Sequence, residues 1–238
     1  MRLFLVKMVE RKEYASSLLR GELYANRLAC FRKFRGDKER EDDLEGVIQE
    51  PPGSRLELEG TDLRTGETGK VIVPLEDMAD RIRRQIRSID SINVFCTFSV
   101  DHNNLEKVPN GNADRQGWRI GPAEVFSEFG EHAVVIWNPP EFIERVEAAA
   151  QRQGYAVSHG HVLYYDPETG PQNIDPEVAA LFAKRNTYAH QKEHRIAINT
   201  GTIGSDPLRL SIGDISDIAL YFNVNNMDRE LSIITQDR

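Results

Sequence analysis

Apolar and polar residues follow one another along the chain in patterns that predict many strands. Residues 92–99 give the strongest strand signal, because this run is rich in β-branched and aromatic side chains and is typical of the centre of a sheet. Further strand patterns occur at 2–9, 133–137, 155–166, 193–199, 208–212, 217–222 and 230–235. Several successive strands are joined by short connections instead of helices. This favours an α+β fold with a mainly antiparallel or mixed sheet and three to four packed helices.

The same patterns predict the helices. One covers residues 11–20, and Gly21 can end it in the left-handed conformation. Asn138 and Asp175 each stand before a proline and can cap a helix that begins there. Residues 75–89 carry apolar side chains at steps of three and four, the spacing of a helix with one buried stripe. That stripe consists of Leu75, Met78, Ile82, Ile86 and Ile89.

No linker rich in serine, glycine or proline divides the chain, so we expect a single domain over residues 1–238. A hairpin at 54–73, with its tip at 60–69, is predicted to project from it. The run of charged residues between Phe34 and Gly46 predicts a solvated loop. Residues 100–120 form a long polar connection that contains Trp118, of the kind that often serves as a lid or binding loop.

Composition narrows the classes of function. A chain with 39% hydrophobic and 29% charged residues can bury a core, and a net charge of −8 argues against nonspecific coating of nucleic acid or anionic lipid. The first apolar run is too short for a secretory signal, and no segment approaches the ~20 apolar residues that span a bilayer. We therefore expect a cytoplasmic protein with no membrane contact. Cys30 and Cys96 stand in apolar surroundings and are predicted to be two buried thiols.

The segment 193–198 holds the main candidate for chemistry. An extended backbone places Glu193 and Arg195 on the face opposite Ile196 and Ile198. Charges are costly to bury unless they are paired and hydrogen-bonded. This pair is therefore either a structural ion pair or the floor of a pocket.

The strand at 92–99 shows the same alternation, with Thr97 and Ser99 pointing away from Val94 and Cys96. If both strands turn their apolar faces to one core, the opposite surface forms a cleft lined by Thr97, Ser99, Glu193 and Arg195. In such a cleft the glutamate would bind a hydroxyl or stabilise positive charge, and the arginine would orient it or hold a phosphate. The alternative is a surface or cross-strand ion pair without a ligand.

Three residues before this strand extend the candidate site. The helix that begins after Asp175 is predicted to reach Tyr188, which would place Lys184 and Tyr188 on adjacent turns of one face. Together with Gln191 they would supply phosphate or aromatic contacts to a ligand in the cleft, and the Trp118 loop would close it. The alternative is that these side chains only cover the surface of the helix.

Other motifs carry less chemistry. His159 and His161 share a face, as two imidazole ligands would need, but no third ligand stands at a diagnostic spacing, so no metal site is predicted. No Gly-x-Ser-x-Gly motif is present for nucleophilic hydrolysis. Four arginines fall off the apolar stripe of 75–89 and form either a solvated helix face or a set of contacts to nucleic acid. They are Arg81, Arg83, Arg84 and Arg87.

A series of short motifs resembles a family of uncharacterised bacterial and prophage proteins, and the match spans about residues 14–198. The motifs are Gly21-Glu-Leu-Tyr24, Phe31-Arg-Lys-Phe34, Asp43-Leu-Glu-Gly46, Phe95-Cys-Thr-Phe-Ser99, Phe129-Gly-Glu-His-Ala133, and Lys184 followed by Gln191-Lys-Glu-His-Arg-Ile196. This resemblance implies no established activity.

The chain also resembles the NAD-using ADP-ribosyltransferases. Thr97, Ser99 and Glu193 stand where that family has a strand with small hydroxyls and a glutamate at the start of a later strand. In that family the glutamate grips the nicotinamide ribose and the hydroxyls brace it, which implies NAD as the ligand. The first strand departs from the pattern, since it offers Arg2 and Lys7 without the family's arginine-or-histidine motif.

Two hypotheses of function follow. The first is an enzyme or sensor that binds a nucleotide or NAD, with transferase chemistry of the ADP-ribosyltransferase type as its most specific form. The second is a non-enzymatic protein-interaction module of a mobile-element or phage-defence system. That module would contact its protein partner through the 81–87 arginines or the 60–69 hairpin tip.

Overall fold

The structure is a computed structural model of the chain. It describes residues 2–33, 45–49, 55–62, 64–74, 83–85, 87–101, 105–108, 117–120, 129–171 and 173–224. The predicted strand at 230–235 lies outside these residues.

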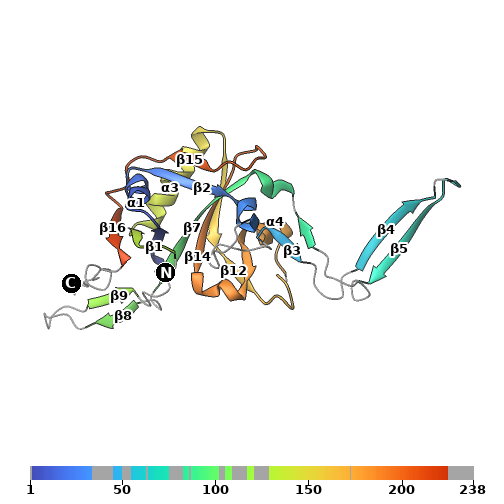
Figure 1. The fold of residues 1–238 in the computed structure, drawn as a ribbon, viewed down its shortest axis with the longest axis horizontal. Helices are drawn as coiled ribbons and strands as arrows, with labels where there is room; N and C mark the ends of the chain where they lie inside the picture. Colours follow the sequence, from blue (N-terminus) through green and yellow to red (C-terminus); the bar gives the residue numbers. More distant parts are fainter. Residues whose placement is uncertain are drawn as a thin grey trace.

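An eight-stranded antiparallel sheet forms the centre of this α+β fold (Figure 1). Its main path runs β11-β14-β7-β1-β10-β16, while β2 pairs with both β7 and β15. The strands are β1 (Arg2–Val9), β2 (Glu22–Arg27), β7 (Ile92–Asp101), β10 (His132–Ile136), β11 (Ala156–His161), β14 (Glu193–Asn199), β15 (Leu208–Ser211) and β16 (Ala219–Asn223). The position of β7 between β14 and β1 confirms that the most β-branched segment is a central strand.

Two helices cover one face of the sheet. Helix α1 (Lys12–Leu19) connects β1 to β2, and α3 (Pro139–Arg152) follows β10. Leu18 of α1 and Phe142 of α3 belong to the same buried cluster as Phe95 and Ile196 of the sheet. The cap at Asn138 is present as predicted, since its side-chain oxygen accepts from the backbone N–H of Glu141 at 3.4 Å.

Gly21 ends α1 in the left-handed conformation, with φ of +83°, as the sequence predicts. Its conformation is not the only reason for glycine here. A Cβ atom at this position would lie 1.8 Å from the carbonyl oxygen of Gly213, and the backbone N–H of Ile212 donates to the Gly21 carbonyl at 2.8 Å. The close approach of these two segments therefore requires the absence of a side chain.

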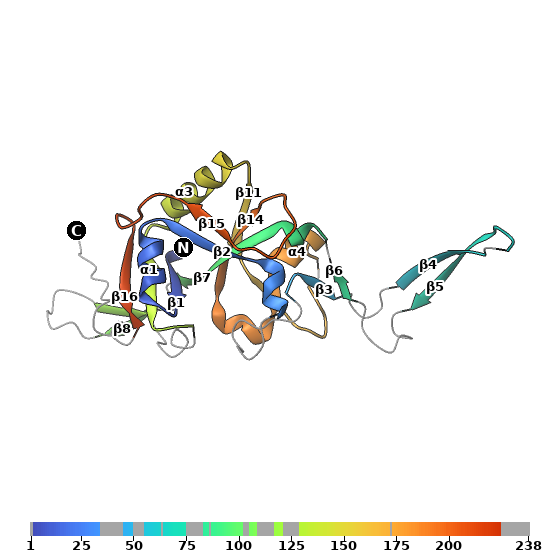
Figure 2. The same cartoon turned by 45° about the horizontal axis from the view of Figure 1, so that its top comes forward.

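The predicted hairpin is formed by β4 (Arg55–Thr61) and β5 (Thr68–Pro74). Figures 1 and 2 show that it extends away from the rest of the molecule. A second hairpin, β8 (Leu105–Val108) with β9 (Gly117–Ile120), occupies part of the region predicted to be a polar connection. Trp118 therefore lies on a strand, with its backbone opposite Lys107.

The predicted helix at 75–89 is wrong where the structure describes it. Residues Arg83–Gln85 form β6, which pairs with β3 (Val47–Gln49), and Arg87–Ser91 form the short 3-10 helix η3. Strand pairing between segments far apart in the chain has overridden the helical spacing. Arg83 and Arg84 are thus on a strand and Arg87 on a 3-10 turn. Arg81 and the rest of the predicted helix lie outside the described residues.

The last predicted helix is shorter than expected. Helix α4 (Pro176–Phe182) is capped by Asp175, but it gives way to β13 (Ala183–Arg185), which pairs in parallel with β12 (Leu163–Tyr165). The 3-10 helix η5 (Asn186–Gln191) then leads to β14. Lys184 and Tyr188 are therefore not on one helix face. Among the described residues, no helix is both long and apolar enough to cross a bilayer.

Candidate functional site

The register between β7 and β14 decides which side chains share a face. Arg195 lies opposite Cys96 and Glu193 opposite Phe98, whereas Thr97 lies opposite His194. Partners directly opposite each other in a ladder project to the same face. The predicted cleft is therefore wrong in one respect, because Thr97 and its neighbour two residues on, Ser99, project to the face opposite that of the glutamate and the arginine.

The hydroxyl of Thr97 shows the consequence. It donates to the backbone carbonyl of His194 at 3.1 Å and is buried, so it braces the pairing of the two strands. Ser99 is also buried, and its backbone N–H donates to the carbonyl of Lys192. A one-residue change of register would move every side chain of a strand to the other face of the sheet. No local pattern in the sequence predicts the register between β7 and β14.

Four charged side chains meet on the Glu193 face of the sheet, and we call them the ion cluster. Arg195 Nε lies 2.7 Å from Glu193 Oε1, and Lys184 Nζ lies 2.7 Å from Glu193 Oε2. Glu45 completes the set: its Oε1 is 2.7 Å from Arg195 Nη1, its Oε2 is 3.3 Å from Nη2, and that second oxygen is 3.6 Å from Lys184 Nζ. Two cations and two carboxylates therefore balance.

The ion cluster is almost closed to solvent. Arg195 and Glu45 are each 1% exposed, Glu193 is 5% exposed and Lys184 is 8% exposed. Polar groups around them complete the hydrogen bonds, as buried charges require. The carbonyl of Leu181 accepts from Arg195 Nη1 at 2.6 Å.

Two more contacts surround the cluster. Gln191 accepts from Lys184 Nζ at 3.3 Å, and the backbone N–H of Glu193 donates to the Tyr164 hydroxyl at 2.9 Å. The prediction that Glu45 belongs to a solvated loop is wrong, because this carboxylate is a fully buried partner of Arg195.

The charges of the cluster set one another's protonation. Burial alone would raise the pKa of Glu193, but Arg195 and then Lys184 outweigh burial and hold that pKa well below its ordinary range. Burial alone would lower the pKa of Lys184, but Glu193 and Glu45 raise it. Glu193, Lys184 and Arg195 are therefore charged across the physiological range.

A cavity of about 430 Å³ opens beside the ion cluster. It lies where the sheet forks: β1 and β2 flank the same edge of β7, at Val6 opposite Phe98 and at Asn26 opposite Val94, and they separate between these points. Helix α1, which joins the two strands, closes the fork with Tyr14. The fork therefore creates space next to a central strand.

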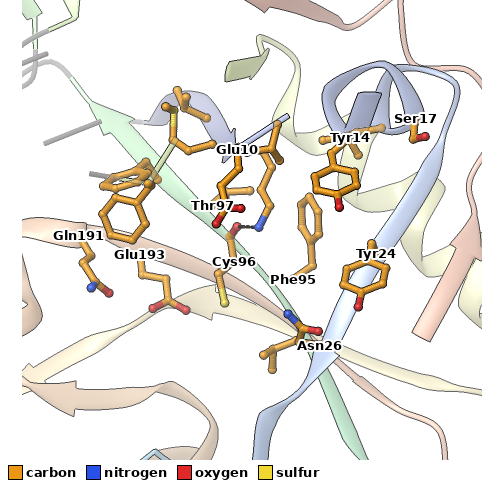
Figure 3. Close-up of a pocket in the computed structure, with 18 of the residues that line it drawn as sticks. Glu10, Tyr14, Ser17, Tyr24, Asn26, Phe95, Cys96, Thr97, Gln191 and Glu193 are labelled. Carbon is orange, nitrogen blue, oxygen red and sulfur yellow. Dashed lines mark hydrogen bonds between the residues drawn. The ribbon is translucent and has the colours of Figure 1, made fainter. Parts of the chain in front are cut away.

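The lining combines charge with aromatic rings. Its ionisable side chains, Cys96 apart, include Lys7, Glu10, Glu22, Lys184, Glu193 and Arg209. Its aromatic side chains are Tyr14, Tyr24, Phe31, Phe95, Phe98 and Phe129. Figure 3 shows Glu193 and Gln191 on one side of the cavity, Tyr14 and Tyr24 on the other, and Cys96 between them. A ligand in this space would contact both kinds of group.

The structure thus brings together only part of the predicted site. Thr97, Lys184, Gln191 and Glu193 line the cavity. Arg195 does not line the cavity, but its Nε forms an ion pair with Glu193 Oε1. Ser99 and Tyr188 are also outside the lining, and the Tyr188 ring centroid lies 5.6 Å from Lys184 Nζ. The side chain of the last predicted residue, Trp118, lies outside the part of the structure that is described.

Lys7, Tyr14 and Tyr24 also line the cavity, but the sequence analysis did not predict them as site residues. Lys7 Nζ donates to the carbonyl oxygen of Cys96 at 2.8 Å and lies 4.7 Å from the ring centroid of Phe95. Arg209 lies 5.3 Å from the ring centroid of Tyr24. A lysine between Val6 and Met8, inside an otherwise apolar strand, was the available signal.

Both cysteines are partly exposed, not buried as predicted. Cys96 lines the cavity, and desolvation together with the negative charge of Glu193 raises the pKa of its thiol to about 12. The histidines form a separate group: His159 and His161 flank the buried His194, with ring centroids 5.7 and 5.8 Å from it. Within the described part of the chain, no three histidine, cysteine or acidic side chains are placed to hold a metal ion.

Comparisons of the chain with protein-family models, curated proteins and solved structures gave no significant match. The two resemblances suggested by short motifs therefore stay predictions, and the assignment of function depends on the geometry of the cavity.

Proposed function

We propose that the cavity binds a nucleotide or NAD, and that the protein is an enzyme or sensor of ADP-ribosyltransferase-like type. The observation that carries this proposal is the position of an ionised Glu193 in the wall of a cavity whose lining also includes aromatic rings and the cations Lys7, Lys184 and Arg209. Nucleotides combine a flat ring, sugar hydroxyls and phosphates, and this lining has a complementary group for each.

The chemistry assigned to Glu193 follows from its low pKa. A carboxylate that stays ionised is a poor general acid or base near neutral pH. It accepts hydrogen bonds from sugar hydroxyls and stabilises positive charge that develops on a bound ligand. Each of its oxygens already accepts from one cation, the Cys96 side chain supplies a further hydrogen bond, and the carboxylate keeps lone-pair capacity for a ligand hydroxyl.

The direct test is binding, measured by calorimetry and by thermal unfolding with NAD, ATP and cyclic nucleotides. A ligand at 100 times its dissociation constant stabilises the folded state by about 2.7 kcal/mol. Tyr24→Ala should weaken binding, because it removes an aromatic ring from the cavity lining. The side chain is 46% exposed, so its loss should have little effect on the stability of the fold. Trp137→Ala is the matched control, since Trp137 is 47% exposed and lies outside the cavity lining. Absence of binding by every nucleotide would reject the proposal.

The β4–β5 hairpin favours a second candidate, a protein-interaction module. An isolated two-stranded hairpin is marginally stable in water, yet this one extends from the molecule with Ile72 58% exposed. A protein partner would stabilise it by covering one of its faces. Replacement of residues 55–74 by a short glycine-serine linker should then abolish binding of the protein partner and leave nucleotide binding unchanged. The reverse result would reject this candidate.

A further inference from the structure

The fork exposes a short stretch of the main chain of β7 inside the cavity. β1 pairs with β7 at Phe98 and beyond, and β2 pairs with it at Asn93 and Val94. Neither strand pairs with the residue midway between these points, Cys96, although Val94 to Phe98 all line the cavity. The edge of the strand at Cys96 is therefore open toward the cavity.

The direction of the Cys96 peptide groups follows from two hydrogen bonds. The backbone N–H of Ser99 donates to Lys192, next to β14, so odd-numbered residues of β7 turn their backbone groups toward that side. The carbonyl of Cys96 points the other way and accepts from Lys7 Nζ at 2.8 Å. In an antiparallel strand the N–H and C=O of one residue point to the same side. Both Cys96 groups therefore face the fork.

This edge offers a donor beside an acceptor. The lysine ammonium uses one of the two lone pairs on the carbonyl oxygen, and the second remains for a ligand. The rings of Phe95, Phe98 and Tyr24 line the same cavity and supply apolar surfaces for a flat group. The main chain at Cys96 therefore has the hydrogen-bonding groups of an unpaired sheet edge.

We propose that the open edge of β7 at Cys96 is a subsite for a nucleobase, whose rim carries a hydrogen-bond acceptor for the Cys96 N–H and a donor for its carbonyl. This inference rests on the proposed nucleotide-binding function and adds to it the means by which the base is held. The base is recognised by the main chain, while sugar hydroxyls are left to Glu193.

The two cysteines of the chain make this testable, because selective 15N labelling of cysteine yields only two backbone amide signals. The Cys30→Ser variant removes one signal and so assigns the other to Cys96. Titration with AMP, GMP and UMP should move the Cys96 amide signal downfield, as a new hydrogen bond to the N–H requires. Cys30 is outside the cavity lining and serves as an internal control.

Ribose 5-phosphate, which has no base, is the matched control ligand. It should leave the Cys96 signal nearly unchanged even at concentrations at which calorimetry shows binding. Binding of a nucleotide without a Cys96 shift, or an equal shift with ribose 5-phosphate, would overturn the subsite and leave the proposed function standing. Absence of binding by every nucleotide would overturn both.

Discussion

Arg195 and Glu45 are 150 positions apart in the chain and form a two-pronged ion pair in the interior, with N–O distances of 2.7 and 3.3 Å. Both side chains are 1% exposed. Removal of either partner would leave an uncompensated buried charge. The first strand after the charge run, β3, is therefore held close to the site by an electrostatic contact, and this contact can be measured.

A double-mutant cycle is the appropriate measurement. Glu45→Gln and Arg195→Met should each reduce the free energy of unfolding by about 3–5 kcal/mol, because each leaves a net buried charge. The double variant keeps the Lys184–Glu193 ion pair, whose net charge is zero. Its loss of unfolding free energy should therefore be smaller than the sum of the two single losses. Urea unfolding provides the values. Additive losses, or single losses below about 1 kcal/mol, would contradict the arrangement.

Stability should depend on pH through Glu193 and Lys184. The folded pKa of Glu193 lies below the unfolded value of about 4.3, so its contribution is present above that pH and is lost as the pH falls. The folded pKa of Lys184 lies above the unfolded value of about 10.4, so its contribution is present below that pH and is lost as the pH rises. The double variant Lys184→Met/Glu193→Gln should show flatter acid and alkaline limbs in unfolding curves. Identical limbs in the two proteins would refute this.

Glu45 should act on ligand binding through the orientation of Arg195. In the wild-type protein, a 2′,3′-dideoxynucleotide should bind more weakly than its parent by about tenfold, the value of one or two hydrogen bonds to a charged acceptor. Glu45→Asp keeps the charge and shortens the side chain, so Arg195 can turn Nη2 as well as Nε to Glu193. The preference for the parent nucleotide should then shrink. Tyr24→Ala, a control, should weaken both ligands equally, and a preference unchanged in Glu45→Asp would speak against the role.

The thiol of Cys96 should react slowly although it lines a cavity. With a pKa of about 12, its thiolate fraction at pH 8 is on the order of a thousand times smaller than that of an ordinary cysteine. In the Cys30→Ser variant, alkylation by iodoacetamide followed by mass spectrometry should be slow at pH 8 and should still accelerate at pH 10. The same protein unfolded in urea is the control. A rate that levels off near pH 9 would show an ordinary thiol.

Helix α4 supports the site because its Leu181 carbonyl accepts from Arg195. Asp175 caps this helix by accepting from the backbone N–H groups of Glu177 and Val178 at 2.9 and 3.2 Å. Asp175→Ala should therefore reduce stability by about 1 kcal/mol, whereas Asp175→Asn should have a smaller effect. Thermal unfolding distinguishes the two. Equal losses in both variants would indicate that the charge, and not the cap, is what matters.

Local signals in the sequence determined much of the fold. The β-branched run at 92–99 and the apolar run at 133–137 became β7 and β10 because their propensities and burial agree. The caps at Asn138 and Asp175 follow from hydrogen bonds within a few residues of each one. The charged pair at 193–195 also indicated an ion-pair site, and the structure supplies its partners in Lys184 and Glu45, because a carboxylate and a guanidinium in an apolar strand need partners.

Only the tertiary structure decided the rest. The register that separates Thr97 from Glu193, the arrival of Glu45 from a charged segment, and the pairing of β6 with β3 where a helix was predicted all depend on contacts between distant residues. The fork between β1 and β2 is of the same kind. No local pattern encodes which strand a segment meets, since that choice depends on the packing free energy of the whole sheet and not on the propensity of any one segment.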